Sequence, residues 1–444
     1  MPGLHLSGLA PTILYFSGFV VVLISASGRP HVGLYYIVPL LPLQTLRYKL
    51  HEFPLGAQWI DLILFGVLIG VWRKKYRVLT PSSLTGLILV FGLLTYIDLW
   101  KGAFFLGYPL PLWFDDQRLS DWKNYMVIFE LFFLTLASIR EVKQMKVLLL
   151  LMCLAVLMIN RDYINTMRGR DFSSFSYDIR DSGVMGYAGV NGLAALEAQL
   201  AVFLLGLSSF YELKRAKWGY FLVLSTSLVA LTYTLSRGGY AAVLLGAVFV
   251  GVVKNRKILV VVFVFLLMWQ SIVPTAVQER VYMTHGEGGE LDPSAGDRVV
   301  LWENAVEMIK SDPILGIGFD TYKFLHAVGP YEDTHNYYVK VTLEIGAIGL
   351  LIFVAMLAKM FLAGFRLRRM EDSDGFLPGL GLGLAAMVVA CAVANCFGDR
   401  WTYIEETGFT WVITAMAIRG HMILTEPEPE THSITDREIV AAAP

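Results

Sequence analysis

Charged residues are scarce in this chain. Of its 444 residues, only 16% are Asp, Glu, Lys or Arg, whereas 56% are hydrophobic. A soluble globular protein carries about 25% charged residues. A soluble chain of this length would form two or three domains, each needing a polar exterior. Because the polar surface for such domains is missing, the composition excludes a soluble enzyme and indicates a polytopic membrane protein.

Cysteine and an excess of one charge sign are also missing. Three cysteines in the whole chain cannot form a disulfide framework. We expect Cys153, Cys391 and Cys396 to lie in the core, because they fall within or at the ends of apolar runs. The formal net charge of −1 argues against a nucleic-acid-binding protein. No cleavable signal peptide is expected, since the first apolar run lacks a basic flank.

Long apolar runs are abundant instead. A helix needs about 20 apolar residues to cross the hydrocarbon layer, and lipid leaves a spanning backbone no partners outside a helix or closed barrel. The sequence therefore predicts an all-α transmembrane bundle of about twelve or thirteen spans, the first three being the least regular. The expected spans lie near 8–27, 31–46, 59–72, 81–100, 123–139, 146–160, 191–210, 218–235, 236–253, 257–275, 336–363, 376–396 and 405–423.

Basic clusters between these runs assign the two sides of the membrane. They lie at 73–77, 140–146, 214–217, 254–257 and 366–369. Each cluster lies two spans from the next, so we place all five in cytoplasmic loops. The loops expected on the outward side are 101–122, 161–190, 276–335 and 397–404.

Two segments interrupt the alternation of spans and short loops. The chain is expected to divide into residues 1–275 with ten spans, a large outer loop at 276–335, and residues 336–423 with three spans. The remainder, 424–444, is acidic and Pro-bearing, which predicts a disordered cytoplasmic tail.

The outer loop is too long to be a simple connection, and long loops of this kind are usually functional. It contains an amphipathic helix predicted at 297–310, with Val300, Leu301, Ala305, Met308 and Ile309 on one face. Ser294 and Asp297 predict a capping box at its start. Pro313, Gly316 and Gly318 predict a tight turn after it.

The sequence Ser236-Arg237-Gly238-Gly239 joins two spans on the outward side, where the charge rule disfavours arginine. Ser236 could cap the second helix, and the two glycines would let an external group approach its free N–H groups. A positive helix end beside Arg237 favours an anion site. The alternative is an arginine that snorkels at a tight turn, which explains the turn but not the charge.

A histidine and a polar stripe mark the point where the outer loop re-enters the membrane. Asn336, Lys340 and Glu344 are spaced four apart, so we expect them on one helix face that lines a water-filled cavity. His335 at its rim could accept a proton from a hydroxyl. The alternative is that His335 lies at the membrane interface and has no functional role. Arg298, near Trp302, could likewise be a solvated charge paired with Asp297 or Glu303.

Other polar groups have simpler explanations. Asp98, Glu130, Glu197 and Gln199 are expected to make packing hydrogen bonds inside the bundle. Asn191 could line the same water-filled cavity as the polar stripe, and Arg168, Arg170 and Arg180 of the preceding outer loop add positive charge there. Asp115 with Asp116, and Asp178 with Asp181, could bind a cation, but these short acidic pairs lack a histidine. Asp372 and Asp374 fall on the cytoplasmic side.

The order of these motifs along the chain is more specific than any one of them. Ser236-Arg237-Gly238-Gly239 precedes Asp297-Arg298-x-x-x-Trp302-x-x-Ala305, then Asp312-Pro313-Ile314-Leu315-Gly316-Ile317-Gly318, then His335-Asn336 and Glu344-Ile345-Gly346-Ala347-Ile348-Gly349. This order resembles the O-antigen ligase and O-antigen polymerase family over about residues 220–355. The runs 183–191 and 29–34 are also similar to members associated with exosortase systems.

The resemblance implies a metal-independent, cofactor-free glycosyltransferase of the bacterial inner membrane that acts on the periplasmic side. Its donor would be a glycan on undecaprenyl diphosphate and its acceptor a hydroxyl of a glycolipid, glycan or protein. Carried over by position, Arg237 and Arg298 would hold the diphosphate and His335 would be the general base, while the roles of Asn336 and Glu344 are less defined. We add Ser236, Gly238, Gly239, Asn191, Arg180 and Trp302 as candidate substrate-binding residues. The outer loop is shorter than in lipopolysaccharide ligases, which leaves the acceptor open.

Three hypotheses about the function of the protein therefore remain. The first is lipid-linked glycan transfer, as ligase, polymerase or protein O-glycosylation enzyme. The second is a small-anion transporter in which Glu130, Glu197 and the Lys340–Glu344 face line a path, although the repeats common in transporters are not seen. The third is a metal-dependent transferase that uses Asp115 or Asp116.

Overall fold

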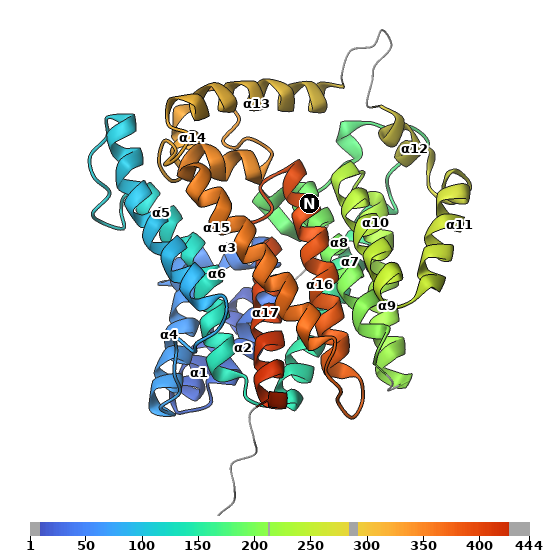
Figure 1. Cartoon of the computed structure of the whole chain (residues 1–444), viewed down its shortest axis with the longest axis horizontal. Helices are drawn as coiled ribbons and strands as arrows, with labels where there is room; N and C mark the ends of the chain where they lie inside the picture. The colour runs from blue at the N-terminus through green and yellow to red at the C-terminus, as the bar shows by residue number, and fades with distance from the viewer. Residues whose placement is uncertain (1–8, 212–213, 284–291, 426–444) are drawn as a thin grey trace, which may run out of the picture.

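The computed structural model describes residues 9–211, 214–283 and 292–425, and within these ranges all regular structure is helical. Figure 1 shows most of the helices standing side by side, which confirms the predicted all-α bundle. The predicted tail at 424–444 lies outside the described residues from position 426 onward. The α-helices are α1 (Leu9–Ala26), α2 (Pro30–Ile37), α3 (Gln44–Lys49), α4 (Trp59–Arg73), α5 (Thr85–Leu106), α6 (Gln117–Ser138), α7 (Val142–Met167), α8 (Gly189–Ser208), α9 (Lys214–Tyr233), α10 (Arg237–Val253), α11 (Arg256–Ile272), α12 (Thr275–Tyr282), α13 (Pro293–Ser311), α14 (Thr321–Leu325), α15 (Tyr337–Leu367), α16 (Phe376–Ala394) and α17 (Ile404–Thr425).

Fewer of these helices qualify as membrane spans than the sequence predicted. Seven are long and apolar enough to cross a membrane, or eight if the bent pair α11 and α12 counts as one span. The predicted twelve or thirteen is therefore higher than the described residues support by length and composition. Some of the remaining long helices carry several charges: α6 includes Arg118, Asp121, Lys123 and Glu130, and α10 has only 17 residues.

One predicted span is broken. Residues 31–46 form α2, a short 3-10 turn at Val38–Leu40 and then α3, rather than one helix. Pro39 and Pro42 explain the break, because proline removes a backbone donor and clashes with the preceding turn. The prediction of one spanning helix at 31–46 is therefore wrong, because the run forms two short helices.

The centre of the bundle is formed by α8 and α16, whose apolar windows are each 83% buried. Glycines allow the two backbones to touch: a Cβ on Gly206 would lie 2.7 Å from the Cα of Gly383. Close packing through small residues is what stabilises helix pairs where lipid removes the hydrophobic drive. Gln199 of α8 accepts a hydrogen bond from Thr410 of α17 at 3.0 Å, as the packing interpretation predicted. Among the cysteines, Cys396 is exposed, so its predicted core position is wrong.

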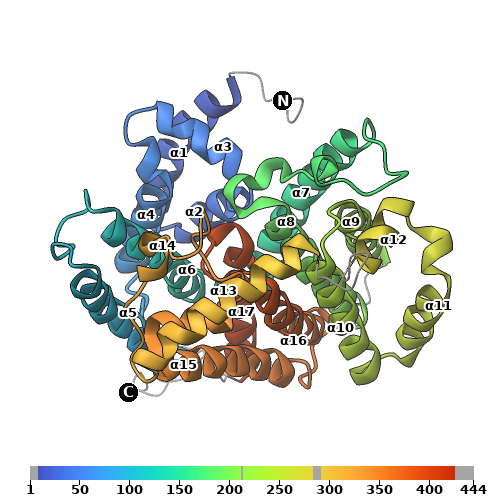
Figure 2. The same ribbon diagram turned by 90° about the horizontal axis from the view of Figure 1, so that it is seen from above.

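One end of the bundle is covered by the outer segment. Figures 1 and 2 show α13 running across this end, with α12 and α14 near its two ends. The predicted amphipathic helix is confirmed, and Leu301 and Ala305 are fully buried on its inner face. Val300 is 51% exposed, so its assignment to the buried face is wrong. The predicted capping box is also wrong: the helix begins at Pro293, and Asp292 caps it by accepting from the N–H of Ser294 at 2.9 Å.

The glycines of the outer segment complete a break in α15. Gly346 has φ of 72°, which interrupts the helix and leaves carbonyls of the preceding turn without intrahelical partners. The N–H groups of Ile317 and Gly318 donate to the carbonyls of Leu343 and Glu344 at 2.9 Å each. A Cβ on Gly316 would lie 2.4 Å from the Glu344 carbonyl carbon. The two glycine motifs are therefore one packing unit that fixes the outer segment to the bundle.

Candidate functional site

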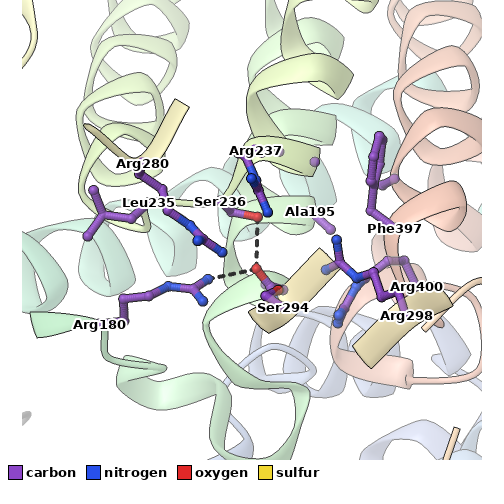
Figure 3. A pocket seen from close by; sticks show the side chains of 14 residues that line it. Arg180, Ala195, Leu235, Ser236, Arg237, Arg280, Ser294, Arg298, Phe397 and Arg400 are labelled. Carbon is purple, nitrogen blue, oxygen red and sulfur yellow. Dashed lines mark hydrogen bonds between the residues drawn. The ribbon is translucent and has the colours of Figure 1, made fainter. Parts of the chain in front are cut away.

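Five arginines converge on one pocket at the covered end of the bundle (Figure 3). They come from five separate segments, and the pocket contains about 420 Å³ of empty space, part of it open to solvent. The arginines are Arg180 in the loop before α8, Arg237 at the start of α10, Arg280 on α12, Arg298 on α13 and Arg400 in the loop before α17. So many guanidinium groups repel one another in the empty pocket and favour an anionic ligand.

Asn191, the third residue of α8, ties two of these segments together. Its Oδ1 accepts hydrogen bonds from Arg180 Nη2 at 2.8 Å and from the Ser236 hydroxyl at 2.9 Å, which are the dashed lines of Figure 3. The structure thus brings together Arg180, Asn191, Ser236 and Arg237, which are all among the site residues predicted from the sequence.

Ser236 occupies the N-cap position of α10, but its side chain makes no capping hydrogen bond. The predicted cap is therefore wrong, because the hydroxyl is directed to Asn191 instead. The residue before it, Leu235, has φ of 54°, so the chain turns sharply into the helix. This turn presents Arg237 to the pocket.

Gly238 and Gly239 line the pocket, but the structure gives them a packing role rather than the predicted open approach. A Cβ on Gly238 would lie 2.8 Å from the Cβ of Phe397, and one on Gly239 would lie 2.9 Å from the Cβ of Ala194. The space that the missing side chains leave is filled by neighbouring helices. These glycines therefore place the N-terminus of α10 close to α8 and to the segment after α16.

The arginines differ in how their charge is balanced. Asp292 is only 2% exposed and contacts Arg237 at 2.6 Å and Arg280 at 3.5 Å. Burial raises the pKa of Asp292, but the hydrogen bond and charge of Arg237 and the charge of Arg280 lower it overall. Arg400 pairs with Glu406 at 3.0 Å. Ion pairs within the described ranges thus join Asp292 and Glu406 to three of the five guanidinium groups, whereas Arg180 is bonded to Asn191 and Arg298 is in none of these pairs.

Arg298 makes none of the ion pairs found among the described residues. Neither predicted alternative, a pair with Asp297 or with Glu303, is formed. Its Nε is buried without a hydrogen-bond partner, and so is that of Arg280. Burial lowers the pKa of Arg298, and the charges of the neighbouring arginines lower it further. A buried cation held among like charges is costly unless a ligand compensates it.

His335 lies outside the residues that line the arginine pocket, in the segment that leads into α15. Its Nδ1 is 2.9 Å from Asp333 Oδ1. The charge of Asp333 also acts on Arg400, which does line the pocket. The histidine is therefore connected electrostatically to the arginine pocket through Asp333.

The other predicted site residues are placed around His335 rather than in the pocket. Trp302 Nε1 donates to the Thr334 carbonyl at 3.0 Å, so α13 supports the histidine segment. Asn336 caps α15 by accepting from the N–H groups of Tyr338 and Val339. Glu344 is 2% exposed and does not reach the pocket.

The predicted cavity-lining stripe is wrong. Lys340 is 8% exposed and lies 3.0 Å from Asp399, in an ion pair inside the protein. Asp399 also accepts from the backbone N–H groups of Trp401 and Thr402. Lys340 lies on a helix as predicted, but it faces Asp399 of the segment before α17 and not water.

The acidic pairs of the outer loops are engaged with arginines. Asp116 caps α6 and pairs with Arg118 at 2.6 Å. Asp181 pairs with Arg170. Among the residues that the structure describes, no group of three His, Cys, Asp or Glu could hold a metal ion.

Sequence reasoning missed three functional candidates: Arg280, Arg400 and Asp333. Arg280 follows Glu279, and Arg400 follows Asp399, so each resembled a charge neutralised locally. Arg280 instead lies over the rings of Phe175 and Tyr177, at 4.9 and 5.3 Å. Asp333 could have been found from its position two residues before the histidine, since that spacing allows a carboxylate to meet the imidazole.

The apolar bundle and the pocket define a class: a multi-pass helical membrane protein with a strongly cationic pocket at one end. The family model described as O-antigen ligase matches residues 221–354. The matched segment coincides with residues 220–355, where the order of motifs resembles this family, so the predicted resemblance is confirmed for this part of the chain. No curated protein matches the chain. The matched segment includes Arg237, Arg280, Arg298 and His335. The match supports a ligase-like glycosyltransferase function at a membrane.

Proposed function

We propose that this protein transfers a glycan from undecaprenyl diphosphate to an acceptor hydroxyl at the periplasmic face of a bacterial inner membrane. The observation that carries the proposal is the convergence of five arginines from five segments on one pocket. Arginine offers forked donors that match phosphate oxygens, and buried guanidinium groups bind such anions strongly.

The charge of the pocket suits the leaving group. Five arginines line the pocket, and Arg180 and Arg298 make none of the ion pairs found within the described ranges. The diphosphate in a lipid-linked glycan is a diester with two negative charges, and bond cleavage adds a further negative charge. Interactions that strengthen as this charge develops accelerate the reaction, and no separate acid is then needed for departure.

In the proposed step, the acceptor oxygen attacks the anomeric carbon while its proton passes to His335 Nε2. The bond from that carbon to the diphosphate oxygen breaks, and its electron pair leaves with the diphosphate held by Arg237 and Arg298. Attack from the face opposite the diphosphate inverts the anomeric carbon. A positioned base contributes typically 10²–10⁴-fold to the rate of such a transfer.

The orientation of the chain supports a periplasmic site. The first turn of α9 and the connection from α15 to α16 lie at the end of the bundle away from α13 (Figure 1), and a basic cluster lies at each of them. Because positive loops stay in the cytoplasm, α13 and the arginine pocket would face outward. The C-terminal end of α17 would then be cytoplasmic.

The experiment is a transfer assay with purified full-length protein and an undecaprenyl-diphosphate glycan, with and without EDTA. Separate reactions contain a lipid A–core oligosaccharide, a free polysaccharide or a protein acceptor, because these three acceptors share the same donor chemistry. We expect release of undecaprenyl diphosphate with one acceptor, insensitive to EDTA. Loss of turnover in EDTA would move the chemistry to the acidic outer loops.

A second assay separates the transport alternative. The same preparation is reconstituted in proteoliposomes and tested for flux of small anions. No turnover with any acceptor, together with anion flux, would overturn the proposal.

A further inference from the structure

We propose that Asp333 is the positioning residue of the base: it fixes the tautomer and orientation of His335 and stabilises the imidazolium formed during transfer. The inference rests on the proposed function, in which His335 takes the acceptor proton. It assigns a role to a carboxylate that neither the motif order nor the arginine pocket includes.

The carboxylate of Asp333 contacts both the backbone and the imidazole ring of His335. Asp333 Oδ1 accepts from the backbone N–H of His335 at 2.6 Å and lies 2.9 Å from Nδ1 of the same residue. Because a carboxylate can only accept, Nδ1 must carry the proton in this contact. The neutral imidazole then has its lone pair on Nε2, which is the form that can take a proton from a hydroxyl.

The backbone around this pair is held from both sides. His335 has φ of 50°, an uncommon conformation for a residue with a side chain. On one side, Trp302 of α13 donates to the Thr334 carbonyl at 3.0 Å. On the other, Thr334 donates to the Asn336 carbonyl at 2.8 Å, and Asn336 caps α15. Strained backbone of this kind persists where surrounding contacts over-determine it, and it is concentrated at functional sites.

Asp333 is suited to remain an anion. Burial raises its pKa, but the hydrogen bond and charge of His335, with the charge of Lys340, hold the pKa well below its usual range. The titratable and charged groups that face His335 and Asp333 are Tyr331, Lys340 of α15, Arg400 and Tyr403 of the segment before α17, and Tyr322 of α14. When Nε2 takes the acceptor proton, the positive charge of the imidazolium lies in direct contact with the carboxylate, while the diphosphate leaves with its electron pair. The proton and the negative charge thus end on separate, compensated groups.

The chain offers a matched control carboxylate. Asp297 of α13 accepts a hydrogen bond from Tyr331, whose ring packs against the His335 ring at 5.5 Å between centroids. It is close to the histidine but does not bond to it. Asp297→Asn therefore tests a charge change nearby without removing the Nδ1 contact.

The test compares full-length wild type with Asp333→Asn, Asp333→Ala, Asp333→Glu, Asp297→Asn and His335→Ala in the transfer assay with the undecaprenyl-diphosphate glycan. We expect Asp333→Ala to lower kcat by about 10²-fold or more, since the orientation of the base is lost. Asp333→Asn should lower kcat and move the acidic limb of the kcat/KM pH profile to lower pH, because the anion that stabilises the imidazolium is gone. Asp333→Glu should recover part of the rate. Donor KM and the melting temperature should change little, and Asp297→Asn should match wild type.

The outcomes separate the two proposals. If His335→Ala keeps full activity, the proposed base, and with it the proposed function of this site, fails. If His335→Ala is inactive but Asp333→Asn keeps the wild-type kcat and pH profile, the positioning role is overturned alone. A loss in Asp333→Asn that is uniform over pH and accompanied by a higher donor KM or a lower melting temperature would indicate a structural role and also overturn it. If Asp333→Ala does not fold, the nearly isosteric Asp333→Asn decides.

Discussion

The arginine pocket and the ion pair between Lys340 of α15 and Asp399 of the segment before α17 use charged residues in opposite ways. Lys340 and Asp399 lie 3.0 Å apart and compensate each other within the protein. In the pocket, Arg298 has no ion pair among the described residues, although it lies among four other arginines. A balanced pair stabilises the fold it sits in, whereas a positive excess prepares a place for an anion from outside. The balance of charge therefore distinguishes a structural site from a binding site.

The largest expected effect is the loss of stability when the ion pair between Lys340 and Asp399 is broken. Lys340→Met leaves Asp399 buried and unpaired, which typically costs about 3–5 kcal/mol. We expect a large fall in the melting temperature in detergent, measured by intrinsic fluorescence, with activity lost only because the protein unfolds. Lys340→Met with Asp399→Asn should recover part of the stability. Unchanged stability in the single variant would show that the pair is not a structural element.

A smaller effect with the opposite signature is expected in the pocket. Arg298→Gln removes a charged donor to phosphate, worth about 1.5–3 kcal/mol, or roughly 10–150-fold in kcat/KM. The melting temperature should not fall, because no buried carboxylate loses its partner. Arg369→Gln, in a predicted cytoplasmic cluster, is the matched control and should keep wild-type kinetics. A drop in stability without a change in kcat/KM would place Arg298 with the structural charges.

The smallest effect should come from Asp292, a carboxylate that pairs with two of the pocket arginines. Asp292 occupies donors of Arg237 and Arg280 that a phosphate could use. Asp292→Asn keeps an acceptor for the cap of α13 but removes the competing charge. We expect undecaprenyl diphosphate to bind about tenfold more tightly, which corresponds to about 1.4 kcal/mol, as measured by microscale thermophoresis. Weaker binding would mean that Asp292 orients the arginines rather than competing for them.

The sequence predicted which charged residues are unusual better than it predicted the contacts that these residues make. Charge scarcity and the position of basic clusters identified Arg237, Arg298 and Arg180 as unusual, and the structure brings them together. Arg400 could not be recognised, because its approach to the pocket depends on how the segment after α16 packs against α10. Lys340 shows the converse: helical spacing gives the face of a residue but not what lies opposite it.

The fold was predictable to a similar depth. The length of the apolar runs predicted the helical class. It did not predict that two prolines break the run at 31–46, or that some long helices carry too many charges to qualify as membrane spans. Gly316 and Gly318 were predicted in a turn and have positive φ, whereas Gly346 was predicted inside a span and also has positive φ. Their joint role in filling the break of α15 required the three-dimensional contact between segments distant in sequence.

The most direct measurement of the central claim is a cryo-electron microscopy structure of the full-length protein in nanodiscs with undecaprenyl diphosphate. We expect the diphosphate to lie between Arg237, Arg280 and Arg298, with its distal phosphate on the side of the pocket toward His335. Diphosphate bound at any other place, with the arginine pocket empty, would contradict it.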